Sequence, residues 1–301
     1  MANLLQILET HKKNPNDKRT FGLVIQGGGM RAAYSCGAMV TLLQYGLTDV
    51  FEHVIGSSAG AMNGAYYLSA DPRAANIYTD EITNKNFVNL LRREKKVDID
   101  YIIDLVLKHK RPLDLDKLRK SHSKLHVIVT NAKNGRKEVL SDHSDFVEIY
   151  EELRATAALP MLYDKTVQIK DKWYIDGGVS DLIPIDVAHE LGCTDIVVVM
   201  TQQVANYRFD RRHTRLVNHL IRRYAKNQPL SVRRILPTNE RVLKVNLRRI
   251  KHPFKATRIY LLEPSDANAL IALSTIDKPK VENLAKLGVT DMDVMLHKDL
   301  S

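Results

Sequence analysis

The amino-acid sequence predicts a three-layer α/β/α fold with a largely parallel central sheet, a helical insertion and a basic C-terminal extension. Apolar, strand-like runs alternate with helical patterns along residues 21–200, which is the order of elements in a parallel sheet. The runs 21–25 and 196–200 are apolar throughout, as is typical of strands buried on both faces. Turns of small residues directly follow three of the predicted strands, at residues 27–29, 56–60 and 176–178.

Length and composition indicate a globular protein. The composition, 44% hydrophobic and 27% charged, is ordinary for a globular protein. A chain of 301 residues is long enough to bury a sizeable core without disulfides or structural metals. The two cysteines, Cys36 and Cys193, give neither a disulfide framework nor metal-ligand spacing, so we expect a reducing compartment and no metal. Residues 1–20 lack the pattern of a signal peptide, and no apolar run approaches the ~20 residues of a membrane-spanning helix. We therefore expect a cytoplasmic protein, with peripheral membrane contact as an option.

The chain divides into an N-terminal helix and linker (1–20), a catalytic core (21–200) and a basic, mainly helical part (201–301) that we expect to pack on the core. Apolar positions at helical or alternating spacing, with Gly and Pro as breaks, predict the elements of this chain. The predicted strands are 21–25, 50–55, 125–130, 137–140, 167–169, 173–175, 196–200 and 258–262. The predicted helices are 4–9, 30–45, 58–69, 146–157, 184–191 and 281–287.

Residues 73–122 are charged and carry no strand signal. Within them, residues 90–96 and 102–110 are candidates for surface helices. We expect the region to cover the core as a helical cap.

The net charge of +10 is unevenly distributed. Residues 205–258 contain 16 basic and two acidic residues, so this segment carries +14 and the rest of the chain −4. Such asymmetry favours an anionic partner, and an anionic membrane attracts each Lys or Arg by ~1 kcal/mol. A solvated helical surface is the alternative. Nucleic acid is a weaker option, because the few aromatic residues of the segment offer little for bases to stack on.

Residues 56–60 read Gly-Ser-Ser-Ala-Gly, the G-x-S-x-G pattern of a nucleophile elbow between a strand and a helix. The glycines of such a turn remove side chains that would clash. The Ser58 hydroxyl then projects above the sheet, near the positive end of the following helix. The pattern therefore makes Ser58 the candidate nucleophile.

Gly27, Gly28 and Gly29 precede a helix, where converging backbone N–H groups stabilise an anion such as the oxygen of a tetrahedral intermediate. Arg31 is a candidate to fix this loop or to hold an anionic substrate group. A tight turn without a ligand is one alternative. A dinucleotide site of the form G-x-G-x-x-A is another, but it needs an acid after the second strand, and Glu52 precedes that strand's last residues.

A serine nucleophile requires a base, usually histidine. His53, His122, His126, His143 and His189 lie outside the basic segment, but none follows a strand in a small-residue turn.

Asp176 is better placed, because it ends a strand and is followed by Gly177-Gly178. Partial burial would raise the pKa of its carboxyl and make it a better base. A simple turn at residues 176–178 is the alternative.

These motifs resemble those of the patatin-like phospholipase family, especially its bacterial members. The glycine-rich loop D-G-G-G-x-R is similar to residues 26–31, the elbow to residues 56–60, the block A-S-x-A-x-P to residues 155–160, and the D-G-G turn to residues 176–178. All four occur in the family's order within residues 21–200. Gln26 stands where the family has an acid, and Thr156 where it has a serine.

The resemblance implies a Ser58–Asp176 dyad without histidine and an oxyanion hole formed by the N–H groups of residues 27–29. It also implies phospholipids or other acyl lipids as substrates, with neither a metal nor another cofactor. A non-enzymatic or regulatory lipid-binding protein on the same fold is the competing interpretation, and a nucleotide-dependent oxidoreductase is a third.

Overall fold

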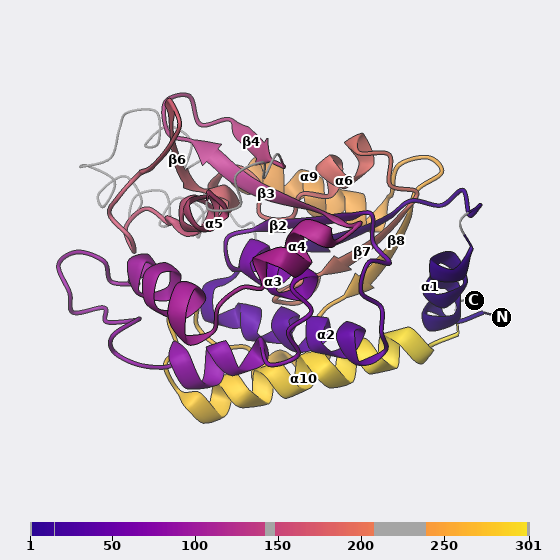
Figure 1. Ribbon diagram of the computed structural model, residues 1–301, viewed down its shortest axis with the longest axis horizontal. Coiled ribbons are helices and arrows are strands. Elements are labelled where there is room, and N and C mark those ends of the chain that lie inside the picture. The colour runs from indigo at the N-terminus through magenta and orange to yellow at the C-terminus, as the bar shows by residue number, and fades with distance from the viewer. Residues whose placement is uncertain (1, 15, 142–147, 208–238, 300–301) are drawn as a thin grey trace.

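A computed structural model describes residues 2–14, 16–141, 148–207 and 239–299. Within these ranges, eight strands form one sheet in the order β5-β6-β3-β2-β1-β7-β8, with β4 also paired to β3 (Figure 1). The strands are β1 (Phe21–Ile25), β2 (His53–Ser57), β3 (Lys124–Asn131), β4 (Lys137–Leu140), β5 (Val167–Ile169), β6 (Lys172–Asp176), β7 (Asp195–Val199) and β8 (Arg258–Leu262). The ends of all eight strands lie within three residues of the predicted ends, so these predictions are confirmed.

The sheet is parallel from β3 to β8 and antiparallel at its other end, where β4, β5 and β6 lie. Strand β3 is longer than β2 and extends beyond it, since Ser57 at the end of β2 pairs with Ile128. Strand β6 pairs with this extension, and Asp176 lies opposite Val129. Asp176 therefore reaches the carboxyl edge of β2 from a strand that runs in the opposite direction.

Helices cover both faces of the sheet, which gives the predicted three-layer α/β/α architecture. One face carries α2 (Ala33–Gln44), α3 (Ala59–Leu68), α5 (Ile149–Ala157) and α10 (Lys278–His297), and the other α6 (Ile185–Glu190) and α9 (Asn239–Lys251) (Figure 1). Alternate residues of β1 face opposite layers. Leu23 and Ile25 pack in the apolar core that also contains residues of α2 and α3, whereas Val24 packs in the core that contains residues of α6. The predicted fold class is confirmed.

Helix α10 is much longer than the predicted 281–287, and it packs along α2. A Cβ atom at Gly37 would lie 2.1 Å from the carbonyl oxygen of Ala285, and one at Gly288 would lie 2.0 Å from that of Tyr34. Only glycine fits at these two positions, so the two backbones approach closely. Gly288, one residue beyond the predicted helix 281–287, is thus a packing residue inside α10.

The capping region 73–122 differs from prediction in its details. Residues 90–96 form no helix, because the Asn89 side chain accepts from the Leu91 N–H at 3.1 Å and a bridge joins Val88 to Val97. The region contains π-helical turns at Ile77–Glu81 and Tyr101–Lys110, and the short helix α4 (Leu115–Lys120). The second π-helix buries several apolar residues, so it is amphipathic rather than a purely surface helix.

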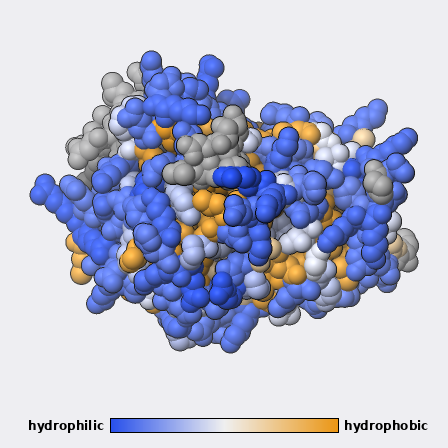
Figure 2. Space-filling view, viewed as in Figure 1, coloured by the Kyte–Doolittle hydropathy of each residue, from blue (hydrophilic) through white to orange (hydrophobic). Residues whose placement is uncertain are grey.

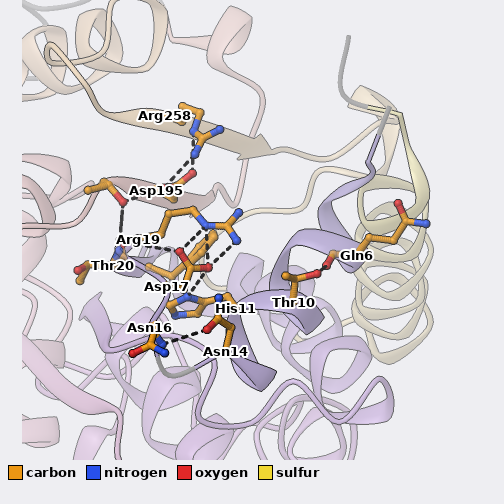
Figure 3. Close-up of polar contacts among 12 residues, drawn as sticks. Gln6, Thr10, His11, Asn14, Asn16, Asp17, Arg19, Thr20, Asp195 and Arg258 are labelled. Atoms are coloured by element: carbon orange, nitrogen blue, oxygen red, sulfur yellow. Dashed lines mark hydrogen bonds and ion pairs between the residues drawn. The ribbon is translucent and has the colours of Figure 1, made fainter.

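Polar contacts hold the N-terminal segment, with α1 (Leu4–Lys13), at the amino ends of the parallel strands (Figure 3). Asp17 accepts from Arg19 Nε at 2.9 Å and contacts His11 Nδ1 at 3.2 Å. The N–H of Asp195, at the start of β7, donates to the Thr20 carbonyl oxygen at 3.2 Å, and Arg258, at the start of β8, contacts the Asp195 side chain at 2.9 Å. None of the helices in the described ranges is both long and apolar enough to cross a bilayer.

Candidate active site

Ser58 lies at the apex of a strained turn between β2 and α3. Its backbone angles, φ 55° and ψ −131°, are ones that residues with side chains rarely adopt. A Cβ atom at Gly56 would lie 2.5 Å from the backbone of Ala61, and one at Gly60 would lie 2.3 Å from the carbonyl oxygen of Ile25. Both flanking glycines are therefore needed for the sharp turn that presents the Ser58 hydroxyl.

Asp176 is the hydrogen-bond partner of this hydroxyl. Ser58 Oγ donates to Asp176 Oδ2 at 2.8 Å, and the Gly178 N–H donates to Asp176 Oδ1 at 2.7 Å. The aspartate is buried, and burial raises its pKa to about 7 although both hydrogen bonds favour the charged form. A carboxylate with that pKa can exchange protons near neutral pH.

No histidine lines the pocket around Ser58 within the described part of the chain. His53 Nδ1 and His126 Nε2 lie 2.9 Å apart on β2 and β3, and His189 stacks on Phe254. His122 is exposed just before β3, and His143 lies outside the described residues.

The glycine loop 27–29 lies directly against the elbow. A Cβ atom at Gly27 would lie 2.6 Å from the Ser57 carbonyl oxygen and 2.9 Å from Ser58 Cβ. Gly29 has φ +54°, and the following Met30 N–H donates to the Leu273 carbonyl oxygen at 3.0 Å. Among the described residues, the N–H groups of the three glycines have no acceptor, so they are available to an anion beside Ser58.

Gln26 fixes the start of this loop. Its Oε1 accepts from the Thr201 N–H at 2.7 Å, and its Nε2 donates to the hydroxyl of Tyr207. A glutamine can accept from one neighbour and donate to the other, which a carboxylate cannot do. Gln26 thus satisfies both of these neighbours at the position where the family has an acid.

Arg31 holds the end of the loop. Its Nε donates to the Ile271 carbonyl oxygen at 2.8 Å, and its Nη1 donates to Gln202 Oε1 at 2.6 Å. Burial lowers the pKa of the guanidinium. Of the two roles predicted for Arg31, these contacts favour anchoring of the loop.

The sequence motifs did not indicate what Thr156 contacts. Its Oγ1 accepts from the Ser58 N–H at 2.8 Å and donates to the Ile128 carbonyl oxygen at 2.5 Å. Thr156 thus connects the elbow to β3 and holds the backbone that carries the candidate nucleophile, Ser58. Its place in the A-S-x-A-x-P block was the available signal, because a serine there supplies the same hydroxyl.

The dinucleotide alternative does not fit this site. Glu52 accepts from the Phe21 N–H at 2.7 Å and contacts His11 Nε2 at 2.8 Å. Both partners lie near the amino end of β1, at the edge of the sheet opposite the glycine loop. Glu52 is therefore out of reach of a ribose bound at residues 27–29.

A cavity of about 340 Å³ opens beside Ser58 and Asp176. Its walls are mainly apolar, and one wall comes from the capping region 73–122. That wall consists of Tyr78, Ile82, Phe87, Val97, Ile99 and Ile102. Leu273 closes another side, so a residue far along the chain contributes to the site. No group of three or more metal-ligating side chains is found within the described ranges.

Comparison with known proteins gives a consistent family. The family model for patatin-like phospholipases matches residues 23–189, more than half of the chain. The Escherichia coli K12 protein YjjU, itself uncharacterised, is 25% identical over 187 residues, which are 60% of this chain and 51% of that protein. Human patatin-like phospholipase domain-containing protein 4 is 24% identical over 164 residues, 52% of this chain and 64% of that protein. The chain thus matches about half to two-thirds of each relative's length.

The crystal structure of VipD from Legionella pneumophila has a related fold. It superposes with a TM-score of 0.50 over 93% of this chain and 67% of that one, at 14% sequence identity. At this identity the likeness concerns the fold alone.

Proposed function

Because the chain belongs to the patatin-like phospholipase family, we propose that it is a serine lipid acyl hydrolase of the phospholipase A or lysophospholipase type. The observation that carries this proposal is the 2.8 Å hydrogen bond from Ser58 Oγ to a buried Asp176, beside glycine N–H groups that have no acceptor among the described residues. Ser58 is the nucleophile, Asp176 the base, and residues 27–29 the oxyanion hole.

In the proposed first step, Ser58 Oγ attacks the ester carbonyl carbon while its proton passes to Asp176 Oδ2. The carbonyl oxygen becomes an anion and is held by the N–H groups of residues 27–29, each such donor contributing about 3–4 kcal/mol to the barrier reduction. The intermediate then expels the alcohol, which takes the proton from Asp176. Water attacks the acyl-serine in the same way, with Asp176 as base, and releases the fatty acid and free Ser58.

The pocket supports an acyl lipid as substrate. Its mainly apolar walls suit a hydrocarbon chain, and its volume of about 340 Å³ lies near the lower end of the roughly 300–1,000 Å³ of ligand pockets. A cavity of this size accommodates part of a lipid, with the remainder outside. We infer that one acyl chain enters and the head group stays near the mouth.

Peripheral contact of a cytoplasmic enzyme with an anionic membrane through residues 205–258 remains a prediction. Residues 208–238, with nine of its 16 basic residues, lie outside the described residues. In the described part, α9 packs its apolar side on the sheet, and Arg241, Arg248, Lys251 and Lys255 are exposed. This exposure supports an anionic partner.

The proposed function is tested by hydrolysis of a soluble short-chain ester with the wild type, Ser58→Ala and Asp176→Asn. We expect both variants to lose at least 100-fold in kcat, on the order of a lost nucleophile or base. Ser57→Ala is the matched control, because the Ser57 hydroxyl is buried one residue away and has no hydrogen-bond partner among the described residues. It should keep its activity.

Labelling with a fluorophosphonate probe gives a second readout. The wild type and Ser57→Ala should be labelled, with the adduct on Ser58. Folded wild-type protein that neither hydrolyses the ester nor reacts with the probe would favour the non-enzymatic lipid-binding alternative. Wild-type activity in both dyad variants would contradict the assignment of the dyad.

A further inference from the structure

Two adjacent leucines in the capping region face solvent. Leu91 is 96% exposed and Leu90 is 53% exposed, and Leu91 is the most exposed large hydrophobic side chain in the described part of the chain. A single exposed leucine is ordinary, but an adjacent pair at a loop tip is apolar surface with no partner in the fold. The loop 89–96 that carries them is the projecting purple segment at the left of Figure 1.

The loop is a built structure. The Asn89 N–H donates to the Lys96 carbonyl oxygen at 2.8 Å, which closes its base next to the bridge between Val88 and Val97. Arg92 Nη2 donates to the Lys85 carbonyl oxygen at 2.9 Å and ties the tip to the preceding turn. These backbone and side-chain contacts therefore hold the loop that carries the two leucines.

Positive charge surrounds the two leucines. Residues 85–96 contain five basic residues and one acid, Glu94. Lys85 and Arg93 are exposed, and neither forms an ion pair with a described residue. Arg92 forms an ion pair with Asp98, and Lys95 forms one with Asp100, at the base of the loop. An apolar tip with a basic rim is complementary to an anionic lipid surface, with its phosphates outside and acyl chains within. Figure 2 shows that most of the face in this view is hydrophilic, with scattered apolar groups.

The loop is continuous with the pocket wall. Phe87 and Val97 flank it on either side, and both line the cavity beside Ser58. The Val97 N–H also donates at 2.9 Å to the carbonyl oxygen of Leu162, which lines the same cavity. A lipid surface in contact with the tip would therefore adjoin the wall of the acyl pocket.

We propose that loop 89–96 docks the protein onto an anionic phospholipid surface, with Leu90 and Leu91 entering the acyl region and Lys85 and Arg93 contacting phosphates. The proposal rests on the proposed function, for which it supplies the route of the acyl chain from the lipid layer to Ser58. It places the contact in the capping region, apart from the basic segment 205–258.

The test is co-sedimentation of the full chain with vesicles of phosphatidylcholine containing phosphatidylglycerol, or of phosphatidylcholine alone. We expect the vesicle partition coefficient of Leu90→Ser/Leu91→Ser to be lower than that of the wild type by roughly tenfold or more, because the variant has no leucine side chains to transfer from water into the lipid. Lys85→Glu/Arg93→Glu should lose most of the preference for anionic vesicles. Val294→Ser is the control, since Val294 is 59% exposed near the carboxyl end of α10, and that end of the helix lies on the opposite side of Figure 1 from the loop.

Each variant is also assayed on the soluble short-chain ester, where we expect wild-type kcat/KM for all of them. Equal partitioning of the leucine variant and the wild type would overturn the proposal. So would loss of binding in Arg248→Glu/Lys251→Glu on α9 but not in the loop variants, because the basic segment would then hold the membrane. Failure of the wild type on the soluble ester refutes the hydrolase instead, and the vesicle assay still decides the role of the loop.

Discussion

Because the carboxyl of Asp176 is buried, we expect activity to rise and stability to fall as the pH increases. Its pKa is about 7 in the folded protein, against a usual value of 3.8. Between these values the folded state keeps a proton that the unfolded state has lost. The free energy of unfolding therefore falls as pH rises through this window, whereas activity that depends on the carboxylate rises toward a limb near pH 7.

The magnitude follows from the size of the shift. The pKa of Asp176 is raised by about three units, and each unit corresponds to about 1.36 kcal/mol. Above pH 7 the folded wild type is therefore less stable by ~4 kcal/mol than a protein with a neutral side chain at residue 176. Asp176→Asn removes this titration and keeps a similar shape. We expect the variant to be inactive and, above pH 7, more stable than the wild type by up to ~4 kcal/mol. For a chain of this size, that is on the order of 10 °C in Tm.

The assay is thermal unfolding of the wild type and Asp176→Asn from pH 4.5 to 8.5, alongside kcat/KM of the wild type. Asp164→Asn removes the same charge from an exposed loop and controls for net charge. The difference in Tm between Asp176→Asn and the wild type should grow with pH and level off above 7. Parallel Tm curves, or an activity limb near pH 4, would refute the reasoning.

Two further predictions concern the backbone around the dyad. Thr156→Val removes the acceptor of the Ser58 N–H, so it should lower the free energy of unfolding by about 1–3 kcal/mol in chemical denaturation and should also lower kcat. Thr156→Ser keeps the hydroxyl and should have nearly wild-type stability and kcat. Equal stability and kcat in the two variants would rule out a role for the hydroxyl. In Gly177→Ala, a Cβ atom would lie 2.0 Å from the Ile128 carbonyl oxygen, so we expect the loss of folded protein in a thermal-shift assay. Gly46→Ala, with φ +64° but open space around it, should cost only about 1–2 kcal/mol, and similar stability of these two alanine variants would contradict the clash.

Local pattern was sufficient to predict the strands and the fold class. Strands such as β1 and β7 are fully buried and flanked by glycine or polar turns, so the apolar run and its ends are both visible in the sequence. The meeting of the glycine loop with the elbow also follows from parallel strands, whose carboxyl ends share one edge. The same reasoning does not apply to Asp176, because β6 is antiparallel and reaches this edge by pairing with the extension of β3.

The remaining features depend on contacts between distant residues, which local patterns do not contain. Leu273 and Gln202 reach the glycine loop from far along the chain, and no motif marks either of them. The charged stretch 90–96 reads as helix, but the Asn89 side chain and the positive φ of Lys95 make it a loop. The predicted helix 281–287 stops before Gly288, whereas the close approach of α2 requires this glycine in the middle of α10.

The glycine loop is held by residues translated long after it. Met30 donates to the carbonyl oxygen of Leu273, Arg31 donates to that of Ile271, and the following helix α10 lies along α2, which the loop leads into. During synthesis, the elbow and Asp176 emerge before these supports exist. We therefore expect the loop to reach its observed position only after residues 271–297 have been made, so that the Ser58–Asp176 pair can form before the site is complete. Until α10 has docked, we therefore expect a nascent chain to have an incomplete candidate site.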